Sequence, residues 1–176
     1  ISMGCVLLSG SKMLWTKSFD AQQTIELLPR CTVMMGVPTY YTRLVGSRDL
    51  DKSCASNMRL FISGSAPLLE DTFIQFYKKT NHHILERYGM TETNIICSNP
   101  LEGERKPETV GMPLKDINLR IVDDSFNALE IGEIGNIQVR GPNVFNSYWN
   151  LPEKTKQDFT SDNYFNTGDK GFVDKD

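Results

Sequence analysis

The sequence predicts an α/β fold in which a portion of parallel β-α-β sheet is followed by an antiparallel, β-barrel-like portion. In the first half, short unbroken apolar runs alternate with amphipathic helical stripes, a pattern typical of buried parallel strands joined by crossover helices. In the second half, apolar and polar residues alternate with a period of two, as in half-buried antiparallel strands. We expect residues 1–98 to form the α/β portion, 99–109 a linking loop and 110–176 the barrel-like portion.

Two helices are expected to connect three parallel strands in the first portion. Pro38 favours a helix directly after the first strand, because proline is tolerated in the first turn of a helix. The second helix is indicated by four apolar side chains at helical spacing. The strands are predicted at 33–37, 60–62 and 84–87, the helices at 38–46 and about 67–80, and the apolar stripe at Leu69, Phe73, Phe76 and Tyr77.

The second portion reads as short strands separated by glycines. Strands are predicted at 117–121 and 137–140, and Pro152 opens a short helix that ends at Phe159. Residues 172–176 are expected to form a strand that leads into an unfinished turn. Since the chain opens with Ile-Ser-Met, without an initiator methionine, we expect it to be a piece of a longer protein.

The composition is that of an ordinary globular protein. The 176 residues include 19 Lys and Arg against 22 Asp and Glu, which gives a net charge of −3, and 39% are hydrophobic. These values argue against a disordered chain. No apolar run approaches the roughly 18 residues that span a bilayer, and the mild acidity gives no reason to expect nucleic acid as a partner. The oligomeric state has no signature in the sequence.

Cysteine and histidine are too scattered or too few for a metal site. No two cysteines form a C-x-x-C pair, which argues against a zinc cluster or a disulfide framework. We expect four reduced, mostly buried thiols, as suits a cytoplasmic protein. The only histidines are adjacent, so a histidine metal site or a Ser-His-Asp arrangement has little support. These residues are Cys5, Cys31, Cys54, Cys97, His82 and His83.

Ligands of open parallel sheets bind at the carboxyl ends of the strands. Segments 37–41, 64–67 and 87–92 follow the three predicted strands, so we expect them to line one edge. The small residues of the middle segment allow a flat ligand to approach the backbone, although a strand-to-helix turn explains them equally well. Tyr88 can stack on an aromatic base, and the alternative for it is a core tyrosine.

Charged residues in these segments suit a nucleotide. Thr91 and Glu92 offer a hydroxyl and a carboxylate suitable for Mg²⁺, although Glu92 also fits a helix-start charge. Asp169, in the run Thr-Gly-Asp, can accept two hydrogen bonds from a diol, and an ordinary turn is its alternative. Arg87 can pair with an anionic group, or form a surface ion pair with Glu86 of little energetic value.

Taken together, these segments resemble the ordered motifs of adenylate-forming enzymes, which include acyl-CoA synthetases, firefly-luciferase-like enzymes and peptide-synthetase adenylation domains. Within this family, the sequences of these segments are most similar to those of malonyl-CoA synthetases. The resemblance implies part of that family's large domain, with one α/β subdomain and part of a distorted barrel. The runs that match the wider family are 63–67 (the adenine loop), 86–93 (Tyr-Gly-x-Thr-Glu), 132–149 and 164–169 (the ribose motif). The segments most similar to malonyl-CoA synthetases are 85–94, 98–100 and 141–145.

The resemblance implies an ATP- and Mg²⁺-dependent acid–thiol ligase that adenylates a carboxylate and transfers the acyl group to coenzyme A. It implies that Glu92 holds Mg²⁺, Thr91 contacts the α-phosphate and Asp169 accepts the ribose hydroxyls, with Thr91 and Glu92 catalytic. Nucleotide contacts fall on Gly64, Ser65, Ala66, Pro67, Glu86, Arg87, Tyr88, Gly89, Met90, Thr91 and Asp169.

The acid is expected to be small, and malonate in particular. Its second carboxylate can be gripped by the guanidinium of Arg87, while Met90 and Tyr40 either shape the same pocket or only pack. The family's Gly-rich phosphate loop and its C-terminal domain with a catalytic lysine are missing from this sequence, so we expect the isolated chain to be inactive. The alternatives are another acyl- or aryl-CoA synthetase, or a non-catalytic nucleotide-binding module.

Overall fold

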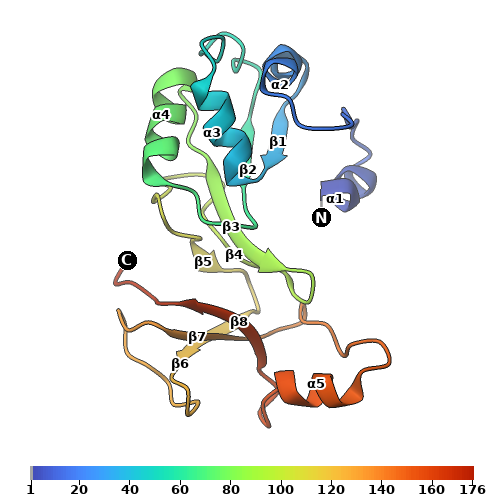
Figure 1. The fold of residues 1–176 in the computed structure, drawn as a ribbon, viewed down its shortest axis with the longest axis vertical. Helices are drawn as coiled ribbons and strands as arrows, with labels where there is room; N and C mark the ends of the chain where they lie inside the picture. Colours follow the sequence, from blue (N-terminus) through green and yellow to red (C-terminus); the bar gives the residue numbers. More distant parts are fainter. Residues whose placement is uncertain (1) are drawn as a thin grey trace. The chain divides into compact units, whose positions relative to one another are not determined.

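The computed structural model describes residues 2–176, which form two compact units (Figure 1). The first unit contains the residues up to Gly89 together with Cys97–Met112. The second unit contains Met90–Ile96 and Pro113–Asp176. The predicted subdomain boundaries at 98 and 110 stay a prediction about the intact protein.

The first unit confirms the predicted β-α-β-α-β order (Figure 1). The strands β1, β2 and β3 are parallel, with Val33 opposite Leu60 and Ile62 opposite Leu85. In the full five-stranded sheet the order is β1-β2-β3-β4-β5. The elements up to residue 113, of which β3, β4 and β5 have residues in both units, are α1 (Ser2–Ser9), α2 (Ala21–Leu27), η1 (Leu28–Arg30), β1 (Val33–Gly36), α3 (Pro38–Gly46), β2 (Leu60–Ser63), α4 (Glu70–Thr80), β3 (Leu85–Met90), β4 (Asn94–Ser98) and β5 (Met112–Pro113).

The burial of the strands follows their place in the sheet. All four residues of β1 are half-buried, so the expectation of a strand buried on both faces is wrong there. The reason is that β1 is an edge strand with a neighbour on one side only. In β2, which lies between β1 and β3, three of the four residues are buried.

Helix α4 begins three residues later than predicted. Leu69 is extended, with φ −67° and ψ 136°, and is 66% exposed, so it stands outside the predicted apolar stripe. Phe73 and Phe76 are buried as predicted. The ring of Tyr77 stacks on that of His83 with centroids 4.0 Å apart. Glu70 in the first turn and lysines in the last turn complement the helix dipole.

The core of the first unit lies between the sheet and its helices. Phe61 of β2 and Tyr41 of α3 both pack edge-to-face against Phe76, with ring centroids 4.8 and 5.4 Å apart. Such aromatic pairs stabilise a core beyond their buried area. The buried residues of this core are Ile25, Leu28, Tyr41, Leu44, Leu50, Ala55, Met58, Phe61, Leu68, Phe73, Phe76 and Ile84.

The second unit contains an antiparallel sheet, as predicted, with strand order β6-β7-β8 (Figure 1). Its elements are β6 (Asn118–Val122), β7 (Gly135–Arg140), α5 (Pro152–Asp158) and β8 (Phe165–Gly171). The strand expected at 172–176 is wrong, because the pairing of β8 with β7 ends where Gly135 faces Gly171. The last strand therefore contains the Thr-Gly-Asp run.

The remaining expectations concern cysteines, metal clusters and membrane helices. The four cysteines are unpaired, but only Cys97 is buried and Cys5 is exposed, so the expectation of mostly buried thiols is wrong. Within residues 2–176 no group of three His, Cys, Asp or Glu side chains is arranged to hold a metal ion. Over the same residues no helix has both the length and the apolar character needed to cross a bilayer.

Candidate functional site

The carboxyl ends of the three parallel strands meet at one edge of the sheet, as predicted. Gly36 of β1 lies opposite Ser63 of β2, and Ser63 lies opposite Glu86 of β3. The segments that follow these residues leave the sheet side by side. This edge is where ligands of parallel sheets bind, and it unites residues 37–41, 64–67 and 87–89 in the first unit.

Arg87 lies close to Gly64 at this edge, where a larger side chain than hydrogen would meet it. A Cβ atom on Gly64 would lie 3.1 Å from the carbonyl oxygen of Arg87 and 3.2 Å from its Nη1. Glycine therefore allows the Arg87 side chain to lie along the loop that follows β2. Arg87 and Glu86 are consecutive residues of β3, so their side chains point to opposite faces, and Glu86 is only 5% exposed. The predicted alternative of a surface ion pair between them is wrong.

The Glu86 carboxylate is buried on the other side of β3. Its residue is 5% exposed, and the carboxylate accepts hydrogen bonds from the backbone N–H groups of Leu68 and Glu108. Burial raises the pKa of Glu86 to about 7. Its Oε1 has no hydrogen-bond partner in the described chain. A nucleotide contact by Glu86 stays a prediction, and the buried carboxylate leaves only the backbone for it.

The loop predicted to contact adenine is exposed and conformationally unusual. Ser65, Ala66 and Pro67 are exposed, and Ser65 adopts a φ of +73°, which non-glycine residues rarely do. Such backbone strain concentrates at ligand-binding loops. At the end of β1, the ring of Tyr40 stacks on Phe19 with centroids 3.9 Å apart. Packing explains this face of Tyr40, and its contact with substrate stays a prediction.

Thr91 and Glu92 lie in the hairpin turn between β3 and β4. The buried Thr93 closes this turn, because its N–H donates to the Met90 carbonyl at 3.2 Å and its hydroxyl accepts from the Met90 N–H at 3.4 Å. Asn143 Nδ2 donates to the Thr93 carbonyl at 2.7 Å. The alternative of Glu92 as a helix-start charge is wrong, since a strand follows. The closed turn leaves Thr91 exposed.

Tyr148 is a neighbour of Glu92 to which the sequence analysis gave no role. The Glu92 carbonyl accepts the Phe145 N–H at 2.8 Å, and the Tyr148 hydroxyl lies 3.5 Å from Glu92 Oε1. Partial burial and the carboxylates of Glu92 and Asp158 raise the pKa of Tyr148 to about 12. The phenol therefore stays protonated beside the predicted magnesium ligand. Its presence in the run 132–149 was the signal that could have drawn attention to it.

Asp169 lies in a bulge of β8, so the alternative of an ordinary turn is wrong. Gln138 of β7 faces Asn166, but Asn136 faces Lys170, so the pairing shifts between these two positions. Asp169 is exposed, and its N–H donates to the Thr167 hydroxyl at 3.2 Å. A half-exposed Glu92 and an exposed Asp169 suit a hard cation and a sugar diol respectively. Their convergence on one nucleotide stays a prediction.

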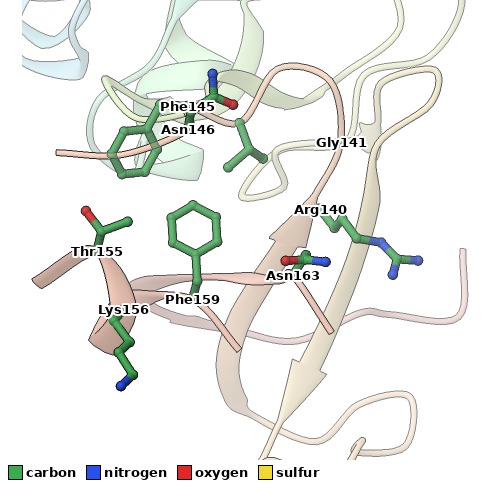
Figure 2. A pocket seen from close by; sticks show the side chains of 9 residues that line it. Arg140, Gly141, Phe145, Asn146, Thr155, Lys156, Phe159 and Asn163 are labelled. Carbon is green, nitrogen blue, oxygen red and sulfur yellow. The ribbon is translucent and has the colours of Figure 1, made fainter. Parts of the chain in front are cut away.

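Two hollows in the described part of the second unit are lined by other residues than the predicted site residues. One has a volume of about 390 Å³ and lies between α5 and the segment after β7. In Figure 2, Phe145 and Phe159 border this hollow, whereas the charged ends of Arg140 and Lys156 extend away from it. None of the residues predicted to bind nucleotide or acid lines it. The residues that line this hollow therefore do not indicate a ligand for it.

Comparison with known proteins identifies similar sequences and structures. The family described as AMP-binding enzyme matches residues 1–149. A malonate–CoA ligase of Arabidopsis thaliana is 43% identical over 176 residues, covering 96% of this chain and 28% of that protein. The ATP-bound structure of MatB from Rhodopseudomonas palustris is 48% identical, with a TM-score of 0.95, over 99% of this chain and 35% of that one.

A further solved structure contains a CoA product together with AMP. It is a malonyl-CoA ligase in a ternary product complex with methylmalonyl-CoA and AMP, 38% identical, with a TM-score of 0.79 over 89% of this chain and 35% of that one. The chain therefore spans about a third of the length of these relatives.

Proposed function

We propose, since the chain belongs to the AMP-binding enzyme family, that it forms the central part of an ATP-dependent acid–CoA ligase. This acyl-CoA synthetase would adenylate a small carboxylic acid, malonate in particular, and transfer the acyl group to coenzyme A. The observation that carries the proposal is the match of 99% of the chain to the ATP-bound MatB structure at a TM-score of 0.95. The unpaired cysteines support a reducing compartment such as the cytoplasm.

The proposed reaction has two displacement steps. A carboxylate oxygen attacks the α-phosphorus of ATP, and the bond to pyrophosphate breaks to leave an acyl-adenylate. The sulfur of coenzyme A then attacks the acyl carbon, and AMP leaves. In such reactions the protein contributes mainly by holding the reactants in line and by stabilising charge. Bound Mg²⁺ would neutralise phosphate charge, and Glu92 is the residue proposed to hold it.

The residues of the first unit would bind the adenine ring of the nucleotide and the second carboxylate of the acid. The Gly64–Pro67 loop would flank adenine, on which Tyr88 would stack. In the second unit, Thr91 would contact the α-phosphate and Asp169 would accept hydrogen bonds from the ribose hydroxyls. The parallel sheet edge, the exposed Thr91 and the exposed Asp169 all support these roles.

Arg87 is the residue proposed to select malonate. Its guanidinium lies beside Gly64 at the sheet edge, and its side chain points to the opposite face of β3 from that of Glu86. A planar guanidinium can hold the second carboxylate of malonate by two hydrogen bonds. Acetate would leave the half-buried Arg87 without this partner, at a cost of about 1–3 kcal/mol. That cost corresponds to roughly tenfold to a hundredfold discrimination.

The test is carboxylate-dependent ATP–pyrophosphate exchange by the intact protein. The wild type is expected to prefer malonate over acetate by roughly tenfold or more. Arg87→Ala should abolish this preference, whereas Arg43→Ala, which removes an exposed arginine from α3, should preserve it. An unchanged preference in Arg87→Ala would refute the selecting role. The isolated 176-residue chain is expected to show no exchange.

A second candidate is another acyl- or aryl-CoA synthetase. The close approach of Arg87 to Gly64 favours it, because this packing gives Arg87 a structural role whatever acid binds. Preference of the intact protein for an aromatic or longer acid in the same exchange assay would support this candidate. Absence of exchange with every acid tested would instead favour a non-catalytic nucleotide-binding module.

A further inference from the structure

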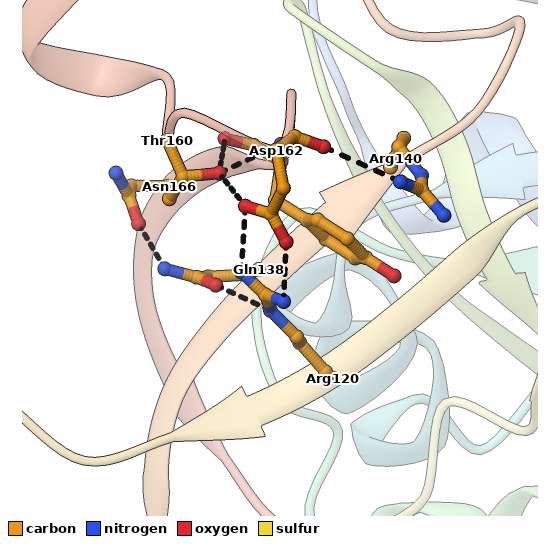
Figure 3. A network of polar contacts seen from close by, with 7 residues as sticks. Arg120, Gln138, Arg140, Thr160, Asp162 and Asn166 are labelled. Carbon is orange, nitrogen blue, oxygen red and sulfur yellow. Dashed lines mark hydrogen bonds and ion pairs between the residues drawn. The ribbon is translucent and has the colours of Figure 1, made fainter. Parts of the chain in front are cut away.

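Three side chains form a hydrogen-bonded row across the sheet of the second unit (Figure 3). Arg120 of β6 lies opposite Gln138 of β7, and Gln138 lies opposite Asn166 of β8. Arg120 Nε donates to Gln138 Oε1 at 2.6 Å, and Gln138 Nε2 donates to Asn166 Oδ1 at 2.6 Å. A slip of one residue would turn either side chain to the other face. The row therefore fixes the register of β8 at Asn166.

The row is anchored at its Arg120 end by the segment that precedes β8 (Figure 3). The guanidinium of Arg120 donates to both carboxylate oxygens of Asp162, at 2.8 and 3.2 Å. The Thr160 hydroxyl donates to Asp162 at 2.6 Å, and the guanidinium also lies 3.8 Å from the centroid of the Tyr164 ring. Because these contacts hold both the approach to β8 and its first residues, the strand is fixed just before the Thr-Gly-Asp run.

The bulge of β8 begins at the next residue. The regular pairing resumes only at Lys170, so Thr167, Gly168 and Asp169 together face Ile137. The Thr167 hydroxyl donates to the Ile137 carbonyl at 2.9 Å and accepts the Asp169 N–H at 3.2 Å. Thr167 thus bridges the bulge with its side chain. Bulges of this kind redirect a side chain out of the regular strand, and here the redirected residue is Asp169.

The polar character of the row is not needed for a stable sheet. Gln138 is fully buried, with 0% exposure. A buried amide must satisfy every polar group, and apolar residues would fill the same space without this demand. What the amide pair adds is a fixed position along the strand, because hydrogen bonds are directional and apolar contacts are not.

We propose that Asn166, held by Gln138, and Thr167 are positioning residues for Asp169: they fix the bulge that presents its carboxylate to the ribose hydroxyls of the nucleotide. This inference rests on the proposed function, in which Asp169 binds the ribose. It adds two residues to that site which do not touch the nucleotide. Their effect is on recognition of the sugar and not on the choice of acid.

The test compares ATP with 2′-deoxy-ATP in malonate-dependent pyrophosphate exchange by the intact protein. One hydrogen bond to a carboxylate is lost with the 2′-hydroxyl, so the wild type should prefer ATP by roughly ten- to a hundredfold in kcat/KM. Asn166→Leu removes the acceptor of Gln138, and Thr167→Val removes the hydroxyl, at nearly constant volume. Each should bring the ATP preference below about threefold, mainly through KM for ATP.

Three variants control for general effects. Asn166→Asp keeps an acceptor for Gln138, and Thr167→Ser keeps the hydroxyl, so both should retain most of the ATP preference. Asn136→Leu removes an amide from the neighbouring strand β7, but that amide donates to Asp124 at 3.0 Å and not to β8, so the preference should be unchanged. The ratio of exchange activity with malonate to that with acetate should be the same in the wild type and in all five variants.

Each outcome decides the proposal. An unchanged ATP preference in folded Asn166→Leu or Thr167→Val would overturn it. Should Asn166→Leu fail to fold, the comparison of Thr167→Val with Thr167→Ser decides. If the wild type shows no exchange, the ligase proposal fails instead, and direct binding of AMP against 2′-deoxy-AMP by calorimetry tests the positioning role. Equal affinities of the wild type for the two nucleotides would then overturn it.

Discussion

The buried carboxylate of Glu86 makes the stability of the chain depend on pH. Desolvation raises its pKa from the ordinary 4.5 to about 7, so the folded chain retains a proton that the unfolded chain has already lost. The contribution of Glu86 to stability is therefore greatest below about pH 4.5 and is lost as the pH rises through 7. The full difference corresponds to roughly 3 kcal/mol, and screening by solvent near the carboxylate reduces it to about 2 kcal/mol.

Glu86→Gln removes this ionisation at nearly constant volume. We expect the free energy of unfolding of the variant, relative to the wild type, to increase by about 2 kcal/mol between pH 4.5 and 8. Urea unfolding of both chains at several pH values measures the difference, and any effect of the amide on packing cancels because it does not vary with pH. Glu102→Gln is the matched control, since it removes the same charge from an exposed position. If the free energies of unfolding of wild type and Glu86→Gln change in parallel with pH, Glu86 does not cause the pH dependence.

Further predictions concern the sheet edge, the second unit and the thiols. Gly64→Ala should raise KM for malonate several-fold, because the new Cβ would lie 3.1 Å from the Arg87 carbonyl oxygen; an unchanged KM in steady-state exchange would contradict this. NMR titration should give Asp162 a pKa of about 2, held low by hydrogen bonds from Arg120, and Arg120→Met should raise that pKa. Cys97 should react with iodoacetamide more slowly than the other cysteines, because burial raises its pKa to about 11, and mass spectrometry after partial labelling checks the order.

The parts of the fold that were predictable are those with a local cause. The apolar run at Val33 and the proline at Pro38 fixed the first strand and the following helix, and α3 spans the predicted residues. The antiparallel strands β6 and β7 followed from their alternating pattern. In each case, neighbouring residues in the sequence carry the signal, and tertiary contacts reinforce it.

The parts that were missed depend on distant residues. The segment Phe165–Gly171 reads as polar and glycine-containing, yet it is a strand because β7 pairs with it and Thr167 bridges the bulge. Glu86 is buried although charged residues are seldom buried, because two backbone N–H groups in distant segments meet its carboxylate. Tyr148 approaches Glu92 across 56 residues of chain. Local pattern contains no information about such partners.

We propose that this chain supplies both ends of one nucleotide site. A crystal structure of the intact protein with AMP and Mg²⁺ would show where the two carboxylates lie relative to the nucleotide. We predict the Asp169 carboxylate within hydrogen-bond distance of the ribose hydroxyls and Glu92 at the phosphate end of the same molecule. AMP bound elsewhere, or contacting only one of these two carboxylates, would contradict the account.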